Sequence, residues 1–274
     1  MSDASTRITY VGHATVLLEV DGVRILTDPL LRLRVAHLRR LVPLEATRPG
    51  VVADIDAVLL SHLHFDHFDV PTLRMFDRGV TMVVPRGGAV NLLRRRGFTE
   101  VRGAEEGTAV SVGPIQVRAV HAQHPGSRGT PWLKGPALGY LIRGSQSIYF
   151  AGDTDVFAEM SELGGADVTL LPVAGWGPRL PEGVHMNPLR AAEALRLLKP
   201  RIAIPIHWGT FAPLWTRHAN PANLSAGAEF QRHAADLAPE VDVRVLSPGD
   251  TFTVPTVPDH SVTSGGESPW PRPS

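Results

Sequence analysis

Three histidines and an aspartate stand within six residues, at positions 62–67, directly after the short apolar run 56–60. The four side chains are His62, His64, Asp66 and His67. The apolar run is predicted to be a buried strand. On extended backbone, side chains two residues apart share a face, so the first two histidines can point the same way. The aspartate and the last histidine follow in a turn and can face a second ion. Imidazole and carboxylate groups suit zinc, manganese or iron, whereas a run of polar loop residues would seldom show this spacing.

The composition narrows the chemistry of such a site. The 274 residues include twelve histidines and no cysteine. Disulfides, thiolate metal sites and cysteine nucleophiles are therefore excluded, and a transition-metal site must use His, Asp or Glu. The 27 basic and 27 acidic residues give a net charge of +0. No global field therefore favours nucleic acid or an anionic membrane, although a local patch is not excluded.

Neither a secretion signal nor a membrane span is expected. The first six residues are polar and lack the apolar core of a signal peptide. No apolar run approaches the roughly 18 residues that span a bilayer. We therefore expect a cytoplasmic protein without a transmembrane segment. The sequence leaves the oligomeric state open, and a homo-oligomer could form.

Apolar and alternating runs predict strands first, and then mixed strands and helices. Strands are expected at 7–20, 23–27, 56–60, 80–84, 109–112, 115–121, 138–142, 147–151, 168–171, 201–206, 243–246 and 251–254. Helices are expected at 68–76, 88–96, 155–163, 188–199 and 222–237. The stretch 30–49, rich in Arg and Leu, could be a short helix or a loop over one rim of a site.

The predicted elements fall into two similar halves. Two sheets packed together, with helices outside, would bury their apolar faces. We predict one domain over 1–254. The end of the chain, 255–274, is dominated by Gly, Pro and Ser and is expected to be a flexible tail.

The run Ser-His-Leu-His-Phe-Asp-His at 61–67 resembles the signature of the metallo-β-lactamase superfamily. Further matching pieces are Gly-His-Ala-Thr at 12–15, Thr-Asp-Pro at 27–29, Ala-Gln-His at 122–124, Gly-Asp-Thr at 152–154, His-Met-Asn-Pro at 185–188 and Pro-Ile-His-Trp-Gly-Thr at 205–210. They span most of the chain and resemble the branch that contains the L-ascorbate-6-phosphate lactonase and N-acyl-phosphatidylethanolamine phospholipase D. The resemblance implies an α+β fold, a four-layer αββα sandwich with a one- or two-metal hydrolytic site along its edge.

By this resemblance, seven side chains bind two divalent ions. Zinc is expected first, with manganese, iron or nickel as alternatives. The first ion is assigned to His62, His64 and His124, the second to Asp66, His67 and His207, and both to a bridging Asp153. His124, Asp153 and His207 each follow a predicted strand, and the ends of these strands would gather at one edge of the fold. His207 could instead be a core histidine, and Asp153 a turn residue. His121 competes with His124, but the Ala-Gln-His match favours His124.

Five further residues could serve the site in other ways. His185 resembles a family histidine near the substrate and could donate to the substrate or leaving group, or could simply precede a helix cap. His13 could line the site or support a ligand. Asp28 could orient a metal-binding histidine or only end a strand. Trp132 and Trp208 could wall an apolar pocket or pack as core residues.

The expected activity is that of a metal-dependent hydrolase. In that reading a metal-bound hydroxide attacks a phosphodiester, a lactone or another ester, and Asp66 could accept a proton. Arginines at 32, 34, 39, 40 and 128 could bind a phosphate or carboxylate, against the common alternative of a solvated basic face. Trp-rich loops favour a small-molecule or lipid-like substrate with an apolar portion.

Two other functions fit the sequence less well than hydrolysis of a small substrate. A nucleic-acid-processing nuclease of the same superfamily would need a basic surface and an inserted clamping domain, and the sequence shows neither, so no nucleic-acid partner is expected. A non-enzymatic binding protein that keeps the fold should have lost ligands, yet all seven are present.

Overall fold

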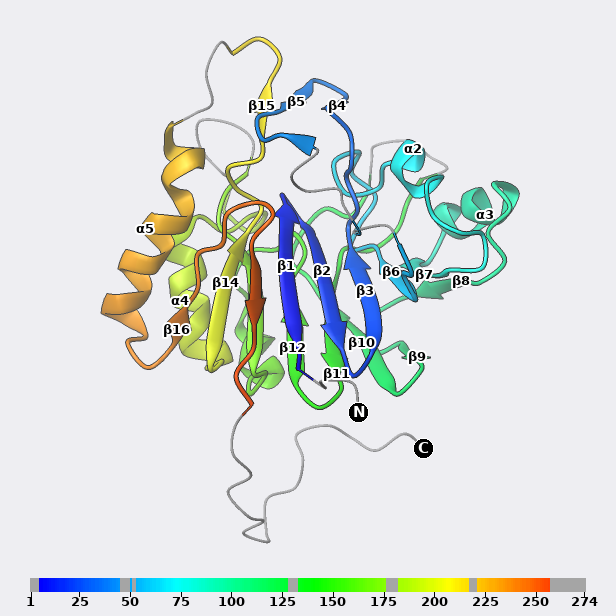
Figure 1. Cartoon of the computed structure of the whole chain (residues 1–274). Helices are drawn as coiled ribbons and strands as arrows, with labels where there is room; N and C mark the ends of the chain where they lie inside the picture. The colour runs from blue at the N-terminus through cyan, green and yellow to red at the C-terminus, as the bar shows by residue number, and fades with distance from the viewer. Residues whose placement is uncertain are drawn as a thin grey trace, which may run out of the picture.

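Two seven-stranded sheets lie face to face at the centre of the structure, and helices cover their outer faces (Figure 1). The computed structural model describes residues 5–44, 50, 53–127, 133–175, 182–216 and 221–256. Its layers confirm the predicted α+β, four-layer αββα sandwich. Within the described residues, no helix is both long enough and apolar enough to cross a membrane.

The first sheet combines an antiparallel half with a parallel half. Its strands, in spatial order, are β17 (Thr251–Thr253), β1 (Arg7–Gly12), β2 (Thr15–Val20), β3 (Val23–Thr27), β6 (Ala57–Leu59), β7 (Thr81–Pro85) and β8 (Val101–Ala104). The strands from β17 to β3 pair antiparallel. Those from β3 to β8 pair parallel, so the carboxyl ends of these four strands meet at one edge.

The second sheet repeats this plan. Its strands, in spatial order, are β16 (Asp242–Val243), β14 (Ile202–Ile206), β13 (Val168–Pro172), β12 (Ser147–Phe150), β11 (Leu138–Arg143), β10 (Ile115–His121) and β9 (Ala109–Val112). Pairing is parallel from β16 to β12 and antiparallel from β12 to β9. A small third sheet contains β15 (Phe211–Pro213), β5 (Leu38–Arg40) and β4 (Arg34–Val35).

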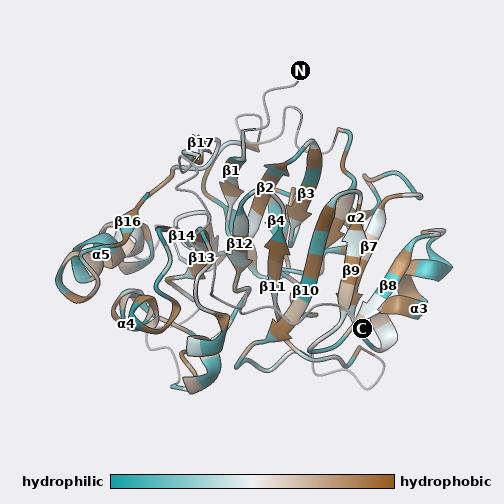
Figure 2. Cartoon of the chain, turned by 90° about the horizontal axis from the view of Figure 1, so that it is seen from below, coloured by the Kyte–Doolittle hydropathy of each residue, from teal (hydrophilic) through white to brown (hydrophobic). Residues whose placement is uncertain are grey.

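Each sheet has its own set of helices. The first sheet packs with α2 (Val70–Leu73) and α3 (Gly88–Arg95), and the second with the 3-10 helix η1 (Ala158–Leu163), α4 (Pro188–Leu198) and α5 (Pro221–Leu237). Seen from below, α4 and α5 lie on one side of the strands and α3 on the opposite side (Figure 2). The predicted start of α4 is confirmed, because the Asn187 side chain accepts a hydrogen bond from Arg190 N at 2.9 Å and Pro188 opens the helix.

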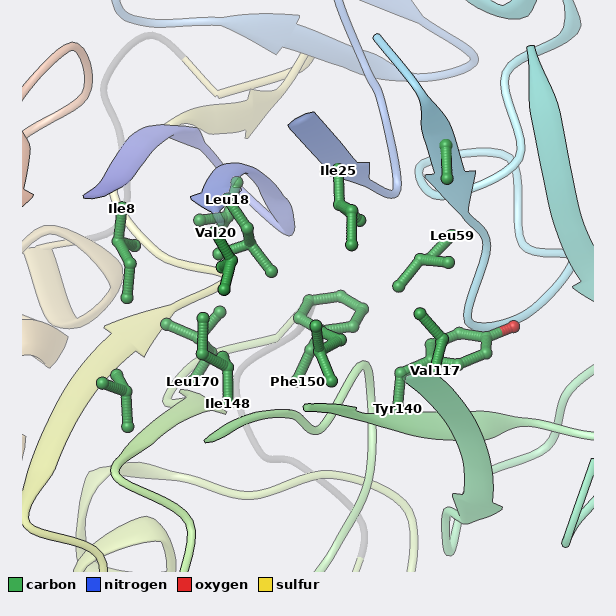
Figure 3. Close-up of a cluster of buried hydrophobic side chains, with 14 of the residues drawn as sticks. Ile8, Leu18, Val20, Ile25, Leu59, Val117, Tyr140, Ile148, Phe150 and Leu170 are labelled. Atoms are coloured by element: carbon green, nitrogen blue, oxygen red, sulfur yellow. The ribbon is translucent and has the colours of Figure 1, made fainter. Parts of the chain in front are cut away.

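The main hydrophobic core lies between the two sheets. Ile8, Leu18 and Ile25 of the first sheet face Tyr140 and Phe150 of the second (Figure 3). In β2, alternate residues serve different layers: Leu18 faces this inner core, while its neighbour Leu17 packs under the outer helices. This alternation explains why the strand reads as almost continuously apolar.

The structure differs from the sequence-based prediction at the first strand. Residues 7–20 form two antiparallel strands, β1 and β2, that reverse around Gly12 and His13. Both residues have positive φ, +122° and +59° respectively. A Cβ atom on Gly12 would lie 2.9 Å from the Thr210 side chain, so the turn depends on the missing side chain. No turn pair such as Asn-Gly marks this reversal in the sequence.

Other differences are local. The stretch predicted as a short helix or loop over 30–49 contains the strands β4 and β5, and residues 45–49 lie outside the described residues. The strands β8 and β15 were not predicted, and the helix predicted at 155–163 is the shorter 3-10 turn η1. The end of the predicted tail, 257–274, lies outside the described residues.

Replacement of Gly152 by alanine tests how tightly the two sheets meet at their shared edge. Gly152 has a φ of +63°, and a Cβ there would lie 2.6 Å from the Ser61 Cβ. We expect Gly152→Ala to lower the free energy of unfolding by about 3 kcal/mol, from backbone strain plus overpacking. The control is Gly107→Ala, where φ is +85° but nothing lies within 4 Å; it should cost only about 1 kcal/mol. Urea unfolding measures both, and equal losses would contradict a close contact at residue 152.

Candidate metal centre

The seven predicted ligands meet at the edge of the sandwich where strands of both sheets end. Four follow β6, one follows β10, one follows β12 and one follows β14; they are His62, His64, Asp66 and His67, then His124, Asp153 and His207. These side chains form overlapping groups, each with its ligand atoms within 4.8 Å of one another. The fold therefore brings together residues that lie up to 145 positions apart, counted from His62 to His207.

Three imidazoles form the first group. Nε2 of His62 lies 2.9 Å from Nδ1 of His64, and Nε2 of His124 lies 3.2 Å from the same nitrogen. His121, the alternative to His124, points elsewhere: its side chain is 49% exposed and lies 3.8 Å from Glu106. The structure thus places His124, and not His121, beside the other two histidines.

The second group combines two imidazoles with a carboxylate. Nε2 of His67 lies 3.3 Å from Nε2 of His207. Oδ2 of Asp66 lies 3.7 Å and 3.9 Å from these two nitrogens. His13 belongs to the same group, with its Nε2 3.1 Å from Asp66 Oδ2. Since an ionised carboxylate only accepts hydrogen bonds, His13 donates here and is placed to orient Asp66.

The turn that carries His13 is fixed by the end of β14. His13 N donates to Thr210 Oγ1 at 2.8 Å, and His207 N donates to His13 O at 2.8 Å. Both His13 and His207 have positive φ, +59° and +63°. Two strained residues from different sheets therefore hold each other in place at the centre.

Asp153 lies between the two groups. Its Oδ2 is 3.8 Å from His62 Nε2 and 3.2 Å from His67 Nε2, and its Oδ1 is 3.3 Å from His207 Nε2. His185 approaches the same carboxylate, with Nε2 3.1 Å from Oδ2. Asp153 is thus the side chain that touches both groups.

In three histidines, Nδ1, the ring nitrogen that points away from the other ligands, lies beside an oxygen that can accept a hydrogen bond but cannot donate one. Nδ1 of His67 donates to Asp28 Oδ2, Nδ1 of His124 donates to Val184 O, and Nδ1 of His207 donates to Ala174 O, each at 2.7 Å. The proton must therefore sit on each Nδ1. The inner Nε2 atom of each ring then faces the centre and presents a lone pair there when the ring is neutral.

Asp28 extends this arrangement to His62 through Ser61. The Asp28 carboxylate accepts from Ser61 N at 2.7 Å and from Ser61 Oγ at 2.6 Å. Ser61 Oγ, having donated its proton, accepts from His62 Nδ1 at 2.9 Å. One buried carboxylate therefore orients a histidine of each group, His67 directly and His62 through the serine hydroxyl.

The electrostatics of the centre favour neutral imidazoles beside charged carboxylates. Burial is the main cause that lowers the pKa of His62, His64, His124 and His207. Burial alone would raise the pKa of Asp66 and Asp153, but the surrounding histidines hold both well below the usual value. These are the protonation states that metal ligands require.

Two histidines depart from this pattern. Burial lowers the pKa of His67, but Asp153, Asp66 and Asp28 together raise it well above the usual value. Burial of His185 acts to lower its pKa, but the Asp153 carboxylate outweighs this effect, so the pKa lies above its usual value. The carboxylates of the centre thus attract positive charge.

The residues fit divalent metal ions on several independent observations. In each group, inward-facing imidazole nitrogens lie about 3 Å apart, close enough to bind the same cation. Asp153 Oδ1 is buried and has no hydrogen-bond partner among the described residues. A donor set of imidazole and carboxylate without thiolate suits zinc, manganese, iron or nickel.

The remaining sequence-based candidates have different surroundings. Trp208 packs against both the inner core and the cluster under α5, stacks near Tyr10 at 6.4 Å, and donates to Pro205 O, so its described contacts are packing contacts. Trp132 and Arg128 lie outside the described residues. Ser61, to which the sequence analysis gave no role, links Asp28 to His62. Its place directly before His62 was the signal that could have revealed this role.

Comparisons with known proteins agree with this geometry. The family model described as "Beta-lactamase superfamily domain" matches residues 23–208. A UPF0173 metal-dependent hydrolase of Rubrobacter xylanophilus is 33% identical over 89% of this chain and 95% of its own length. An N-acyl-phosphatidylethanolamine-hydrolyzing phospholipase D of Caenorhabditis elegans is 30% identical over 77% of this chain and 65% of its own.

A solved structure shows the same arrangement of strands and helices. Igni18, described as a novel metallo hydrolase from the archaeon Ignicoccus hospitalis, superposes with a TM-score of 0.70 at 26% identity, covering 91% of this chain and 98% of its own. With a family model matched over more than half of its length and a relative 33% identical across nearly all of it, the chain belongs to the metallo-β-lactamase superfamily, among the UPF0173 metal-dependent hydrolases.

Proposed function

We propose that the protein hydrolyses a phosphodiester, a lactone or another ester in a small-molecule or lipid-like substrate, with two divalent ions bound at the centre. The observation that carries this proposal is the pair of adjoining ligand groups with Asp153 between them. The names of the relatives support it, since they include metal-dependent hydrolases and a phospholipase that cleaves a phosphodiester of a lipid.

The two groups suggest how the ions would be shared. His62, His64 and His124 would hold the first ion; Asp66, His67 and His207 would hold the second. Asp153, which approaches both groups, would contact both ions. Bound divalent ions, zinc foremost, would lower the pKa of a nearby water and polarise the scissile group. The ligand set has no cysteine, so manganese, iron or nickel could take the same places.

The protein's own residues position and transfer protons around these ions. The Asp66 carboxylate, held ionised by its histidine neighbours, is placed to accept a proton from the attacking water. His13 donates to that carboxylate at 3.1 Å and so fixes its orientation. His185 is held through Nδ1, which donates to Met186 O at 3.3 Å, and its Nε2 lies 3.1 Å from Asp153 Oδ2, where it is placed to donate to the substrate or the leaving group.

The direct test is turnover by protein loaded with zinc or manganese on a panel of substrates. We expect hydrolysis of bis-p-nitrophenyl phosphate or of a lactone, and loss of that activity together with bound metal in Asp153→Asn. Metal per protein is measured by elemental analysis. Asp236→Asn on the exposed face of α5 is the matched control and should keep both ions. A fully loaded protein with no turnover on any substrate would overturn the proposal.

The Asp28–Ser61 contacts make a distinguishable prediction about metal affinity. Asp28→Asn should lower the affinity for both ions by about 10- to 100-fold, because Asp28 orients a histidine of each group. Ser61→Ala should weaken mainly the ion held by His62, because only that histidine depends on the hydroxyl. Competition with a chelator measures both affinities without any substrate. Asp56→Asn is the control, since that carboxylate accepts from Arg24 N far from the centre. Equal weakening of both ions in Ser61→Ala would contradict this assignment.

His185 can be separated from the metal ligands by its effect on metal content. We expect His185→Gln to lower kcat by about 10²- to 10⁴-fold, the range typical for loss of a proton donor, with both ions retained. Kinetics and elemental analysis on the same sample decide the matter. If an ion is lost with the side chain, His185 is a ligand and not a donor to the substrate.

A further inference from the structure

The small sheet β15-β5-β4 forms a cap at the upper end of the sandwich in Figure 1, where β1 ends and the chain turns at His13. We define the cap as residues 30–44 and 208–216. Its own apolar core, which includes Leu30, Leu38 and Phe211, is buried. The surface of the cap, in contrast, is unusually apolar.

Three of the five exposed large hydrophobic residues among the described residues belong to the cap. Trp215 is 73% exposed, Leu33 60% and Leu214 43%. These three side chains are not part of the buried core of the cap, so they do not contribute to its packing. Leu214 and Trp215 form the tip of the cap at the His37 end of the small sheet, and Leu33 lies at its other end, beside Arg40. Large exposed apolar side chains on one small element commonly mark a contact with another molecule or with a membrane.

A chain of aromatic contacts connects this apolar tip to the metal centre. The Trp215 ring stacks on His37, with ring centroids 5.2 Å apart and an interplanar angle of 22°. His37 in turn meets the edge of Phe65 at 5.4 Å. Phe65 stands between His64 and Asp66 in the ligand-bearing turn. A molecule that contacts the tip of the cap is therefore only a few side chains away from the centre.

The charge of the cap has one sign. Its two segments contain four arginines and neither Asp nor Glu, although the whole chain has a net charge of +0. Arg40 is buried against the Phe211 ring, at 4.9 Å, and Arg32 pairs with Asp69 at 3.0 Å. Arg34 is exposed, and no carboxylate of a described residue forms an ion pair with it.

These features together suit one partner. Tryptophan favours the boundary between lipid headgroups and acyl chains, leucine gains from entering it, and arginine is attracted by anionic headgroups. We propose that the cap docks on an anionic phospholipid bilayer, with Trp215, Leu214 and Leu33 at the headgroup boundary and Arg34 among the lipid phosphates. This docking goes beyond the proposed hydrolysis and holds whichever bond is cleaved.

The test is co-sedimentation of the full chain with vesicles. The two vesicle preparations are an equal mixture of phosphatidylcholine and phosphatidylglycerol, and phosphatidylcholine alone. We expect binding to the anionic vesicles, about tenfold weaker binding to the neutral ones, and release as salt is raised. Absence of binding of the unaltered protein to the anionic vesicles would overturn the proposal.

Paired variants assign the binding to the cap. Arg34→Glu and the double variant Trp215→Ser with Leu33→Ser should each weaken vesicle binding about tenfold or more. The controls lie on α5, where Leu224 is 49% exposed and Arg232 is exposed; Leu224→Ser and Arg232→Glu should bind as the unaltered protein does. Equal losses in the controls would contradict docking through the cap.

Two further readouts separate this proposal from others. Metal content and the thermal midpoint of each variant show that its fold and centre are intact, so a docking failure is distinguishable from a failure of the hydrolase proposal. Size-exclusion chromatography reports self-association. If Trp215→Ser dissolves a dimer and leaves vesicle binding unchanged, the tip is an interface between protein copies and the membrane proposal is wrong.

Discussion

The centre depends on how its histidines are held from outside. Nδ1 of His67, His124 and His207 each donates to a carboxylate or backbone oxygen at 2.7 Å, so the inner nitrogens of these rings carry lone pairs. His67 and His207 are also almost fully buried, so packing limits how far their rings can turn. The fold thus holds imidazole nitrogens and carboxylates close together, in an arrangement that bound cations would stabilise.

The sandwich provides the rigid frame that this arrangement needs. Parallel strands in both sheets end at the same edge, and the inner core between them fixes the distance between the sheets. Asp28 in the first sheet and Asp153 in the second then approach the same histidines from opposite sides. Because each group contains ligands from both sheets, a shift between the sheets would separate them.

The sequence predicted the layers and the ligands better than it predicted the connections. The apolar runs before His62, Asp153 and His207 located the strands that carry them. The reversal at Gly12 was missed, because residues 7–20 alternate without a turn signal and the turn is specified by a close contact with Thr210. The strand β15 was missed for a similar reason: it pairs with β5, about 170 residues earlier in the chain, and such pairing has no local signature.

The order of amino acids establishes which chemical groups are available: imidazole and carboxylate, no thiol, and a dense cluster of ligands after a buried strand. The tertiary structure alone decided which of these groups face one another, because the partners are distant in sequence and their distances depend on how the two sheets pack. It placed His124 beside His64 and turned His121 toward solvent, although the two lie three residues apart. It also places the proton of His124 and of His207 on Nδ1, because these nitrogens donate to the backbone carbonyls of Val184 and Ala174. Contacts with backbone carbonyls cannot be predicted from residue types.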